Sequence, residues 1–146
     1  MQKNRQAFTM IELVFVIVIL GILAAVAFPR LVATRTDAVI SKGRADISSI
    51  RSAIINERQG RLIQGDSSFI TGLNLNTGGL FGGVLTYPVS DTNNSSGHWH
   101  KVSDSNATAV YTYNIDGVNC SFTYNSTTGA FTLDASQDAI CDNLVN

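Results

Sequence analysis

The sequence carries little charge, and almost no positive charge over its second half. Asp, Glu, Lys and Arg make up 14% of the 146 residues, and the formal net charge is −1. Beyond Arg61, Lys101 is the one remaining Lys or Arg. A region without clustered cations cannot neutralise a row of phosphates, so we expect no nucleic-acid partner.

Histidine, cysteine and proline are also scarce, with two of each. No Ser/His/Asp order, phosphate-binding loop or pair of catalytic carboxylates stands out, so we expect no enzymatic activity and no cofactor. His98 and His100 flank Trp99, but an obvious third ligand for a metal is missing nearby. We expect this triplet to form an exposed turn.

What the sequence does have is one long apolar segment near its start. Residues 13–28, LVFVIVILGILAAVAF, contain no charged or polar side chain. The 21 residues from Phe8 to Phe28 would form about 31 Å of helix, which matches the ~30 Å core of a bilayer. We therefore predict a membrane-spanning helix. A secretory signal peptide is the alternative, because a basic stretch precedes the segment and small residues within it could mark a cleavage site: Ala24, Ala25 and Ala27.

The two cysteines, Cys120 and Cys141, both follow this segment. An even pair on the far side of a membrane favours a disulfide, whose loop of about 20 residues would contribute roughly 3 kcal/mol of stability. Two unpaired thiols are the alternative. A zinc site is disfavoured because the sequence has no CxxC pair.

Residues 7–13, AFTMIEL, follow a short leader with Lys3 and Arg5 and precede the apolar run. This arrangement resembles the prepilin N-terminus of type IV pilins and of the pseudopilins of type II secretion and DNA-uptake systems. The resemblance implies that a prepilin peptidase cuts between Ala7 and Phe8 and that Phe8 is then N-methylated. Ala7 stands where the family most often has Gly.

Glu12 is the one acid within the predicted membrane span. The resemblance implies that it neutralises the N-terminal amine of a neighbouring subunit in a filament. A lone carboxylate at mid-bilayer costs ~2.5–3.5 kcal/mol on insertion scales, and a buried amine is unfavourable too, so each group relieves the other. The alternative is a Glu that only snorkels to the lipid headgroups.

Gly21 and Pro29 fall where the family places weak points in this helix. Gly costs ~1 kcal/mol in a helix, and Pro removes a hydrogen bond and clashes with the preceding turn. The resemblance implies that the stretch between them partly unwinds on packing into a filament. The alternative is an ordinary membrane Gly with a modest kink at Pro29.

A helical stripe follows Pro29 and predicts that the helix continues to Gln59, with Gly60 as its stop. The stripe comprises Ala33, Thr36, Ile40, Gly43, Ile47, Ile50 and Ile54. Charged residues fall off the stripe, on the expected solvent side: Arg44, Asp46, Arg51, Glu57 and Arg58. We expect the stripe to pack on a sheet.

Three strands are predicted near the C-terminus. Residues 109–115 alternate between apolar and polar side chains, which predicts a strand. Asp116-Gly117 predicts a hairpin turn, and residues 118–124 would form the second strand of that hairpin. A second turn at 125–129 leads to a third strand at 130–133. Weaker strand signals lie at 80–87 and 100–102.

The predicted fold is α+β: a long N-terminal helix, membrane-spanning and then amphipathic, packed on a small antiparallel β-sheet with a C-terminal disulfide loop. Its predicted parts are a leader (1–7), a transmembrane and assembly helix (8–29) and a head (30–146). The head divides into a helix (30–59), a variable loop (60–108), a β-meander (109–134) and a tail (135–146).

Two patterns in the head carry further hypotheses. Asp134, Asp138 and Asp142 are spaced by four, and some pseudopilins bind calcium near the C-terminus, but the sequence has no EF-hand loop. Calcium is therefore a minor alternative to having no cofactor.

Five Asn residues begin N-x-[ST] triplets: Asn93, Asn94, Asn106, Asn119 and Asn125. Asn93 and Asn106 also have an Asp two residues upstream, which resembles the extended acceptor of bacterial periplasmic oligosaccharyltransferases. We hypothesise that these two are glycosylated; chance in a Ser/Thr/Asn-rich loop is the alternative.

The sequence as a whole predicts a structural subunit of a type IV-like filament, either a type II secretion pseudopilin or a type IV pilin. It would insert in the inner membrane by a single pass with its head in the periplasm, and then polymerise through its N-terminal helix. The expected partners are copies of itself, related pilins, the prepilin peptidase and an inner-membrane assembly platform. The alternatives are a minor subunit with an adhesin or DNA-uptake role, and a membrane-anchored domain that never polymerises.

Overall fold

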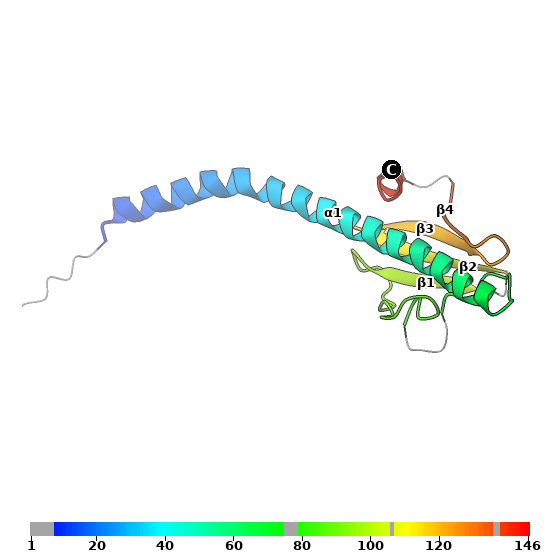
Figure 1. Ribbon diagram of the computed structural model, residues 1–146. Coiled ribbons are helices and arrows are strands. Elements are labelled where there is room, and N and C mark those ends of the chain that lie inside the picture. The colour runs from blue at the N-terminus through cyan, green and yellow to red at the C-terminus, as the bar shows by residue number, and fades with distance from the viewer. Residues whose placement is uncertain (1–7, 75–78, 106, 136–137) are drawn as a thin grey trace, which may run out of the picture. The chain divides into compact units, whose positions relative to one another are not determined.

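α1 (Met10–Ile63) is one α-helix of 54 residues. The computed structural model in Figure 1 describes residues 8–74, 79–105, 107–135 and 138–146. The chain divides into two compact units, one ending at Arg35 and one spanning Thr36–Asn146. α1 contributes to both units, and the second unit also contains the sheet.

The end of α1 lies at Ile63, so the predicted stop at Gly60 is wrong. Gly60 stays helical although glycine costs about 1 kcal/mol there relative to Ala. The Arg61 Nε donates to Glu57 Oε1 at 3.0 Å, one turn back, and this pair supports the last turns. Gly65, with φ of 87°, takes the left-handed conformation that ends the helix.

Four antiparallel strands form one sheet in chain order: β1 (Trp99–Asp104), β2 (Thr108–Ile115), β3 (Val118–Asn125) and β4 (Ala130–Leu133). The three-stranded meander is confirmed, and β1 adds an edge strand longer than the weak signal at 100–102. The strand predicted at 80–87 is wrong. That segment forms turns instead, closed by an isolated bridge between Leu80 and Val89.

The turn between β2 and β3 has the geometry that its sequence predicts. Asp116 and Gly117 have φ of 48° and 97°, and two left-handed residues are what a type I′ hairpin requires. The turn before β4 ends at Gly129, with φ of 71°. A Cβ at Gly129 would lie 2.1 Å from a ring carbon of Phe69, so this turn needs glycine for space as well.

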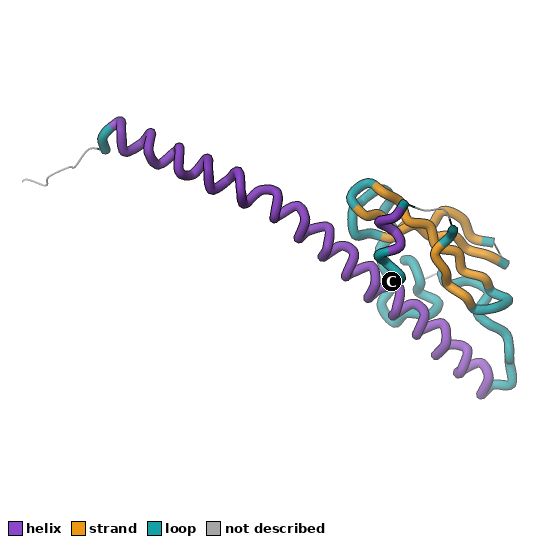
Figure 2. Tube along the Cα trace, turned by 90° about the horizontal axis from the view of Figure 1, so that it is seen from above, coloured by secondary structure: helices purple, strands orange, loops and turns teal. Residues whose placement is uncertain are grey.

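The part of α1 that belongs to the second unit, residues 36–63, lies along one face of the sheet, as Figures 1 and 2 show from two directions. The predicted stripe faces the sheet and is buried at Ile47, Ile50 and Ile54. The sheet contributes buried aromatic rings to the same core: Trp99, Tyr111, Tyr113, Phe122, Tyr124 and Phe131. Alternate residues of β2 and β3 supply most of these rings, as the period of two predicts.

Gly43 lies where α1 packs tightly against Leu144 and Tyr113. A Cβ there would lie 2.6 Å from Leu144 Cδ2 and 2.7 Å from Tyr113 Cε1. The Tyr113 side chain reaches from β2 to α1 here and donates its hydroxyl hydrogen to the Val39 carbonyl at 2.8 Å. The glycine in the predicted stripe therefore serves helix–sheet packing.

Trp99 is fully buried, so the expected exposed turn at residues 98–100 is wrong. A buried indole N–H needs an acceptor, and Trp99 Nε1 donates to Asp46 Oδ2 at 3.1 Å. Asp46 consequently faces the sheet and not solvent. Arg58 also departs from the predicted solvent side, because its guanidinium carbon lies 3.9 Å from the centre of the Phe69 ring.

The predicted disulfide between Cys120 and Cys141 is confirmed, with Cα atoms 5.5 Å apart. Cys120 lies on β3, and Cys141 lies on the short helix α2 (Ala139–Asp142). The bond ties the tail to an inner strand of the sheet, and Leu144 beyond it is buried. Cys141 and Leu144 of the tail therefore belong to the core.

Candidate functional site

The first turn of α1 is built as a capping box by Thr9 and Glu12. The Thr9 backbone N–H and hydroxyl both donate to Glu12 Oε2, at 2.9 and 2.8 Å. The Glu12 backbone N–H donates to Thr9 Oγ1 at 3.3 Å. The T-x-x-E spacing that predicts this pair is present in the sequence, but the sequence analysis missed it.

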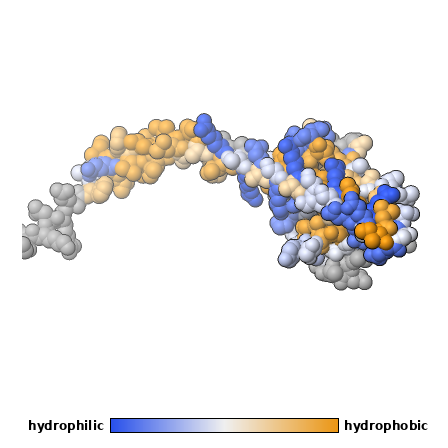
Figure 3. Space-filling view, in the orientation of Figure 1, coloured by the Kyte–Doolittle hydropathy of each residue, from blue (hydrophilic) through white to orange (hydrophobic). Residues whose placement is uncertain are grey.

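The helix that follows this turn exposes its apolar side chains. Within the described residues, Met10–Phe28 is long and apolar enough to cross a membrane, and none of it is buried. In Figure 3 hydrophobic residues gather along this part of α1. Water disfavours such a surface, so a hydrophobic surrounding is needed to cover it, and the helix fits membrane anchoring.

Phe8 lies directly before the capping box, and its side chain is 81% exposed. Ala7, the other predicted processing residue, lies outside the described residues. The site therefore consists of an exposed Phe8 and a carboxylate, Glu12, one helical turn further along, folded back towards Thr9.

The two predicted weak points both lie inside continuous helix. α1 runs through Gly21 and Pro29 without a break. A Cβ at Gly21 would meet no atom of the described residues within 4 Å, so no contact in that part of the chain requires glycine there. Whether the stretch between the two unwinds in a filament stays a prediction.

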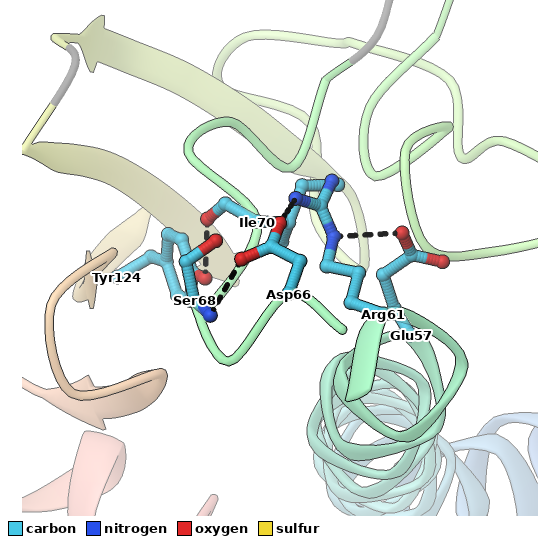
Figure 4. Close-up of polar contacts among 6 residues, drawn as sticks. All are labelled: Glu57, Arg61, Asp66, Ser68, Ile70 and Tyr124. Atoms are coloured by element: carbon cyan, nitrogen blue, oxygen red, sulfur yellow. Dashed lines mark hydrogen bonds and ion pairs between the residues drawn. The ribbon is translucent and has the colours of Figure 1, made fainter. Parts of the chain in front are cut away.

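Polar contacts that the sequence analysis did not find tie the loop after α1 to the end of the helix and to β3 (Figure 4). Arg61 pairs with Glu57 at 3.0 Å and with Asp66 at 3.5 Å. Hydrogen bonds from Ser68, and then the Arg61 charge, lower the pKa of Asp66. Tyr124 donates from its hydroxyl to the Ile70 carbonyl at 2.7 Å. These contacts anchor the chain as it leaves α1.

The remaining predicted site residues are dispersed over the second unit. Asn93 is exposed, and Asn106 lies outside the described residues. Asp138 caps α2 by accepting from the Ile140 N–H at 3.1 Å. His100 Nδ1 lies 2.7 Å from Asp91 Oδ1. In the part of the chain that the structure describes, no three His, Cys, Asp or Glu side chains gather as metal ligands would.

Comparison with known proteins agrees with the N-terminal geometry. Residues 2–28 match the prokaryotic N-terminal methylation motif. The chain is also similar to the type II secretion system core protein G of Pseudomonas aeruginosa, with 40% identity over 55 residues, or 37% of this chain. That match spans 39% of the relative's length. No solved structure matches the chain. The motif and the partial match together support a pilin or pseudopilin.

Proposed function

From this pilin- or pseudopilin-type N-terminal region, we propose that the chain is a structural subunit of a type IV-like filament. It inserts in the inner membrane through the first part of α1, with its head in the periplasm. A prepilin peptidase then removes residues 1–7, Phe8 is N-methylated, and an inner-membrane platform assembles the subunits. The function is assembly, and it involves no catalysis by this chain.

The observation that carries the proposal is the position of Glu12. Its carboxylate lies one helical turn from Phe8, at the start of a helix whose apolar side chains are left exposed by the residues that the structure describes. Cleavage before Phe8 would create a new amine beside this turn. In the apolar interior of a helical bundle, that amine and the Glu12 carboxylate of a neighbour would neutralise each other and set the axial register.

The distribution of charge in the rest of the chain also supports assembly. Residues 30–61 carry seven Lys or Arg and three Asp or Glu, whereas residues 62–146 carry one Lys or Arg and seven Asp or Glu. Identical subunits in an open helical filament contact each other through two different surfaces. The basic segment 30–61 and the acidic segment 62–146 offer such a complementary pair of surfaces on one chain.

Two variants of Glu12 test the proposal. Glu12→Gln keeps an oxygen that can accept from Thr9, because Gln also forms capping boxes, but it removes the charge. Glu12→Leu removes both the acceptor oxygen and the charge. We expect both variants to reach the membrane and to be cleaved, and both to yield filaments reduced roughly tenfold or more, as loss of ~1.4 kcal/mol in subunit contacts would produce.

The readouts are the mass of the N-terminal peptide and the amount of filament sheared from cells. Filaments at wild-type levels from both variants would overturn the role proposed for Glu12, and the absence of filaments from the wild-type chain would favour a membrane-anchored domain that does not polymerise. Loss in Glu12→Leu with normal assembly in Glu12→Gln would assign Glu12 to helix capping alone.

Within the filament class, a type II secretion pseudopilin is the more specific candidate, because the relative in Pseudomonas aeruginosa is a type II secretion protein. A deletion strain discriminates. A pseudopilin deletion would leave exported proteins in the periplasm without loss of surface pili. A pilin deletion would remove surface pili and leave secretion intact.

A further inference from the structure

The structure separates the N-x-[ST] triplets of the head into two groups. Asn93, Asn94, Asn119 and Asn125 lie in its described part, and Asn106 does not. Transfer of a glycan to Asn requires the side-chain amide to leave the protein surface and enter an enzyme. The accessibility and hydrogen bonds of each amide therefore decide which triplet can be used.

Three of the four amides are held by the fold. Asn119 Nδ2 donates to Asn94 Oδ1 at 3.2 Å, and Asn119 Oδ1 accepts from Asn114 Nδ2 at 2.7 Å. Asn125 Oδ1 accepts the N–H groups of the turn that follows it, Thr127 at 2.8 Å and Thr128 at 3.3 Å. Asn94 is also fixed in a left-handed conformation, with φ of 54°. Using any of these triplets would break contacts of the folded head.

Asn93 differs from all three. It is exposed, and its side chain makes no hydrogen bond to another described residue. It is the first residue of a short loop, 93–96, whose two ends are held by backbone hydrogen bonds. The Thr92 N–H donates to the Trp99 carbonyl at 2.9 Å, and the Gly97 N–H donates to the Asn114 carbonyl at 2.8 Å. The loop thus presents Asn93 to solvent from an anchored base.

The acid two residues before Asn93 is on the same exposed loop. The Asp91 carboxylate is 41% exposed and lies 2.7 Å from His100 Nδ1 on β1. It therefore keeps a defined position beside Asn93. At this triplet the Asn93 side chain is exposed and its amide is not held by a hydrogen bond to a described residue. The loop that carries it is anchored, and the Asp91 carboxylate is held in place by His100.

We propose that Asn93 is an N-glycosylation site. The donor is a polyprenyl-diphosphate-linked oligosaccharide. The Asn93 Nδ2 forms a bond to the anomeric carbon of the first sugar and loses one proton, while the anomeric C–O bond breaks and the lipid diphosphate leaves with the electron pair. No atom is oxidised or reduced. The step rests on the proposed function in one respect, since it needs the head on the side of the membrane where the donor is used.

The chain offers a direct test in its native host. Trypsin cuts after Lys and Arg, so one peptide, residues 62–101, contains both Asn93 and Asn94, and residues 102–146 contain the other three triplets. We expect the 62–101 peptide of the purified native protein to carry a sugar mass, whereas a sugar mass on the 102–146 peptide would report on the other three triplets. An unmodified 62–101 peptide, or a glycan on 102–146 alone, would overturn the proposal.

Two matched variants assign the residue. Ser95→Ala destroys the Asn93 triplet and leaves the Asn94 triplet intact, because Ser96 follows. Asn94→Gln destroys the Asn94 triplet and leaves that of Asn93. We expect the sugar mass to disappear in Ser95→Ala and to persist in Asn94→Gln. The reverse result would assign the glycan to Asn94 and contradict the proposal that the exposed Asn93 is the acceptor.

The same digest reports on the filament proposal separately. The peptide ending at Arg30 reveals whether the chain begins at a methylated Phe8. A processed N-terminus with an unmodified 62–101 peptide overturns the glycosylation proposal alone. An unprocessed N-terminus contradicts the filament proposal, whatever the loop carries.

Discussion

The Glu12 carboxylate accepts two hydrogen bonds from Thr9, from its backbone N–H at 2.9 Å and from its hydroxyl at 2.8 Å. In the mature chain that we propose, Thr9 is the second residue, so the acid is folded back towards the new N-terminus. The capping box and the proposed intersubunit pair therefore use the same carboxylate. Changes at Thr9 can separate the two roles without altering the charge of Glu12.

We predict that Thr9→Ala lowers filament yield less than Glu12→Leu does. Loss of an N-cap costs about 0.5–2 kcal/mol, but the carboxylate that would pair with the neighbour's amine remains. Thr9→Ser keeps the hydroxyl and is the control, with assembly near wild type. Sheared filament, normalised to cleaved subunit, is the measurement. More filament from Thr9→Ala than from wild type would mean that the cap competes with assembly.

Glycine at position 43 is predicted to be required for stability, in contrast to glycine at position 60. A Cβ at Gly43 would clash with Leu144 and Tyr113, whereas a Cβ at Gly60 would meet no atom within 4 Å. We expect Gly43→Ala to destabilise the head by about 1–3 kcal/mol through overpacking. We expect Gly60→Ala to stabilise it by about 0.5–1 kcal/mol through helix propensity.

Urea unfolding of the detergent-solubilised chain measures both changes. Trp99 is the single tryptophan and is fully buried, so its fluorescence reports the core. Equal shifts of the urea midpoint in the two variants would contradict the packing described at Gly43.

Removal of the disulfide is predicted to lower stability by roughly 3 kcal/mol. Cys120 and Cys141 are separated by 21 residues, and closing a loop of that size has this effect in the chain-entropy model. The double variant with Ser at both positions should unfold at a lower urea concentration. Reductant should lower the midpoint of the wild type and leave that of the double variant unchanged. A wild-type urea midpoint that does not change when reductant is added would contradict the prediction.

The sheet was predictable where local signals sufficed. Alternation in residues 109–115 and the Asp116-Gly117 turn identify a hairpin from neighbouring residues alone. β1 was underestimated because its pattern is short and its register with β2 shifts between Lys101 and Ser103, and such an irregularity interrupts the alternation by which a strand is identified. Trp99 shows the same limit: its burial depends on α1, which precedes it by tens of residues, and nothing local to the triplet encodes that contact.

The helix shows which parts of the site needed the structure. Sequence periodicity identified the buried face of α1, but it assigned Asp46 and Arg58 to solvent. Their partners, the Trp99 indole and the Phe69 ring, come from segments whose positions a sequence pattern does not predict. The capping box of Thr9 and Glu12 was readable from its spacing. The same acid also fits the pairing between subunits that the resemblance implies, so its spacing is compatible with two roles.

Alkaline unfolding is predicted from the buried tyrosines of the sheet. Burial raises the pKa of Tyr111, Tyr113 and Tyr124 above the ordinary value of 10.0. A group whose pKa is raised by folding stabilises the fold fully below its unfolded pKa and loses that contribution as pH rises through the folded value. Stability should therefore fall as pH climbs above about 10.

The urea midpoint measured from pH 8 to pH 12 checks this prediction. Tyr124→Phe should flatten the alkaline fall, although it also removes the hydrogen bond to the Ile70 carbonyl and lowers the free energy of unfolding at pH 8 by about 1 kcal/mol. Tyr87→Phe is the matched control, because the Tyr87 side chain is 86% exposed and adds little to the core. If Tyr87→Phe flattened the alkaline fall as much as Tyr124→Phe, the buried rings would not be its cause.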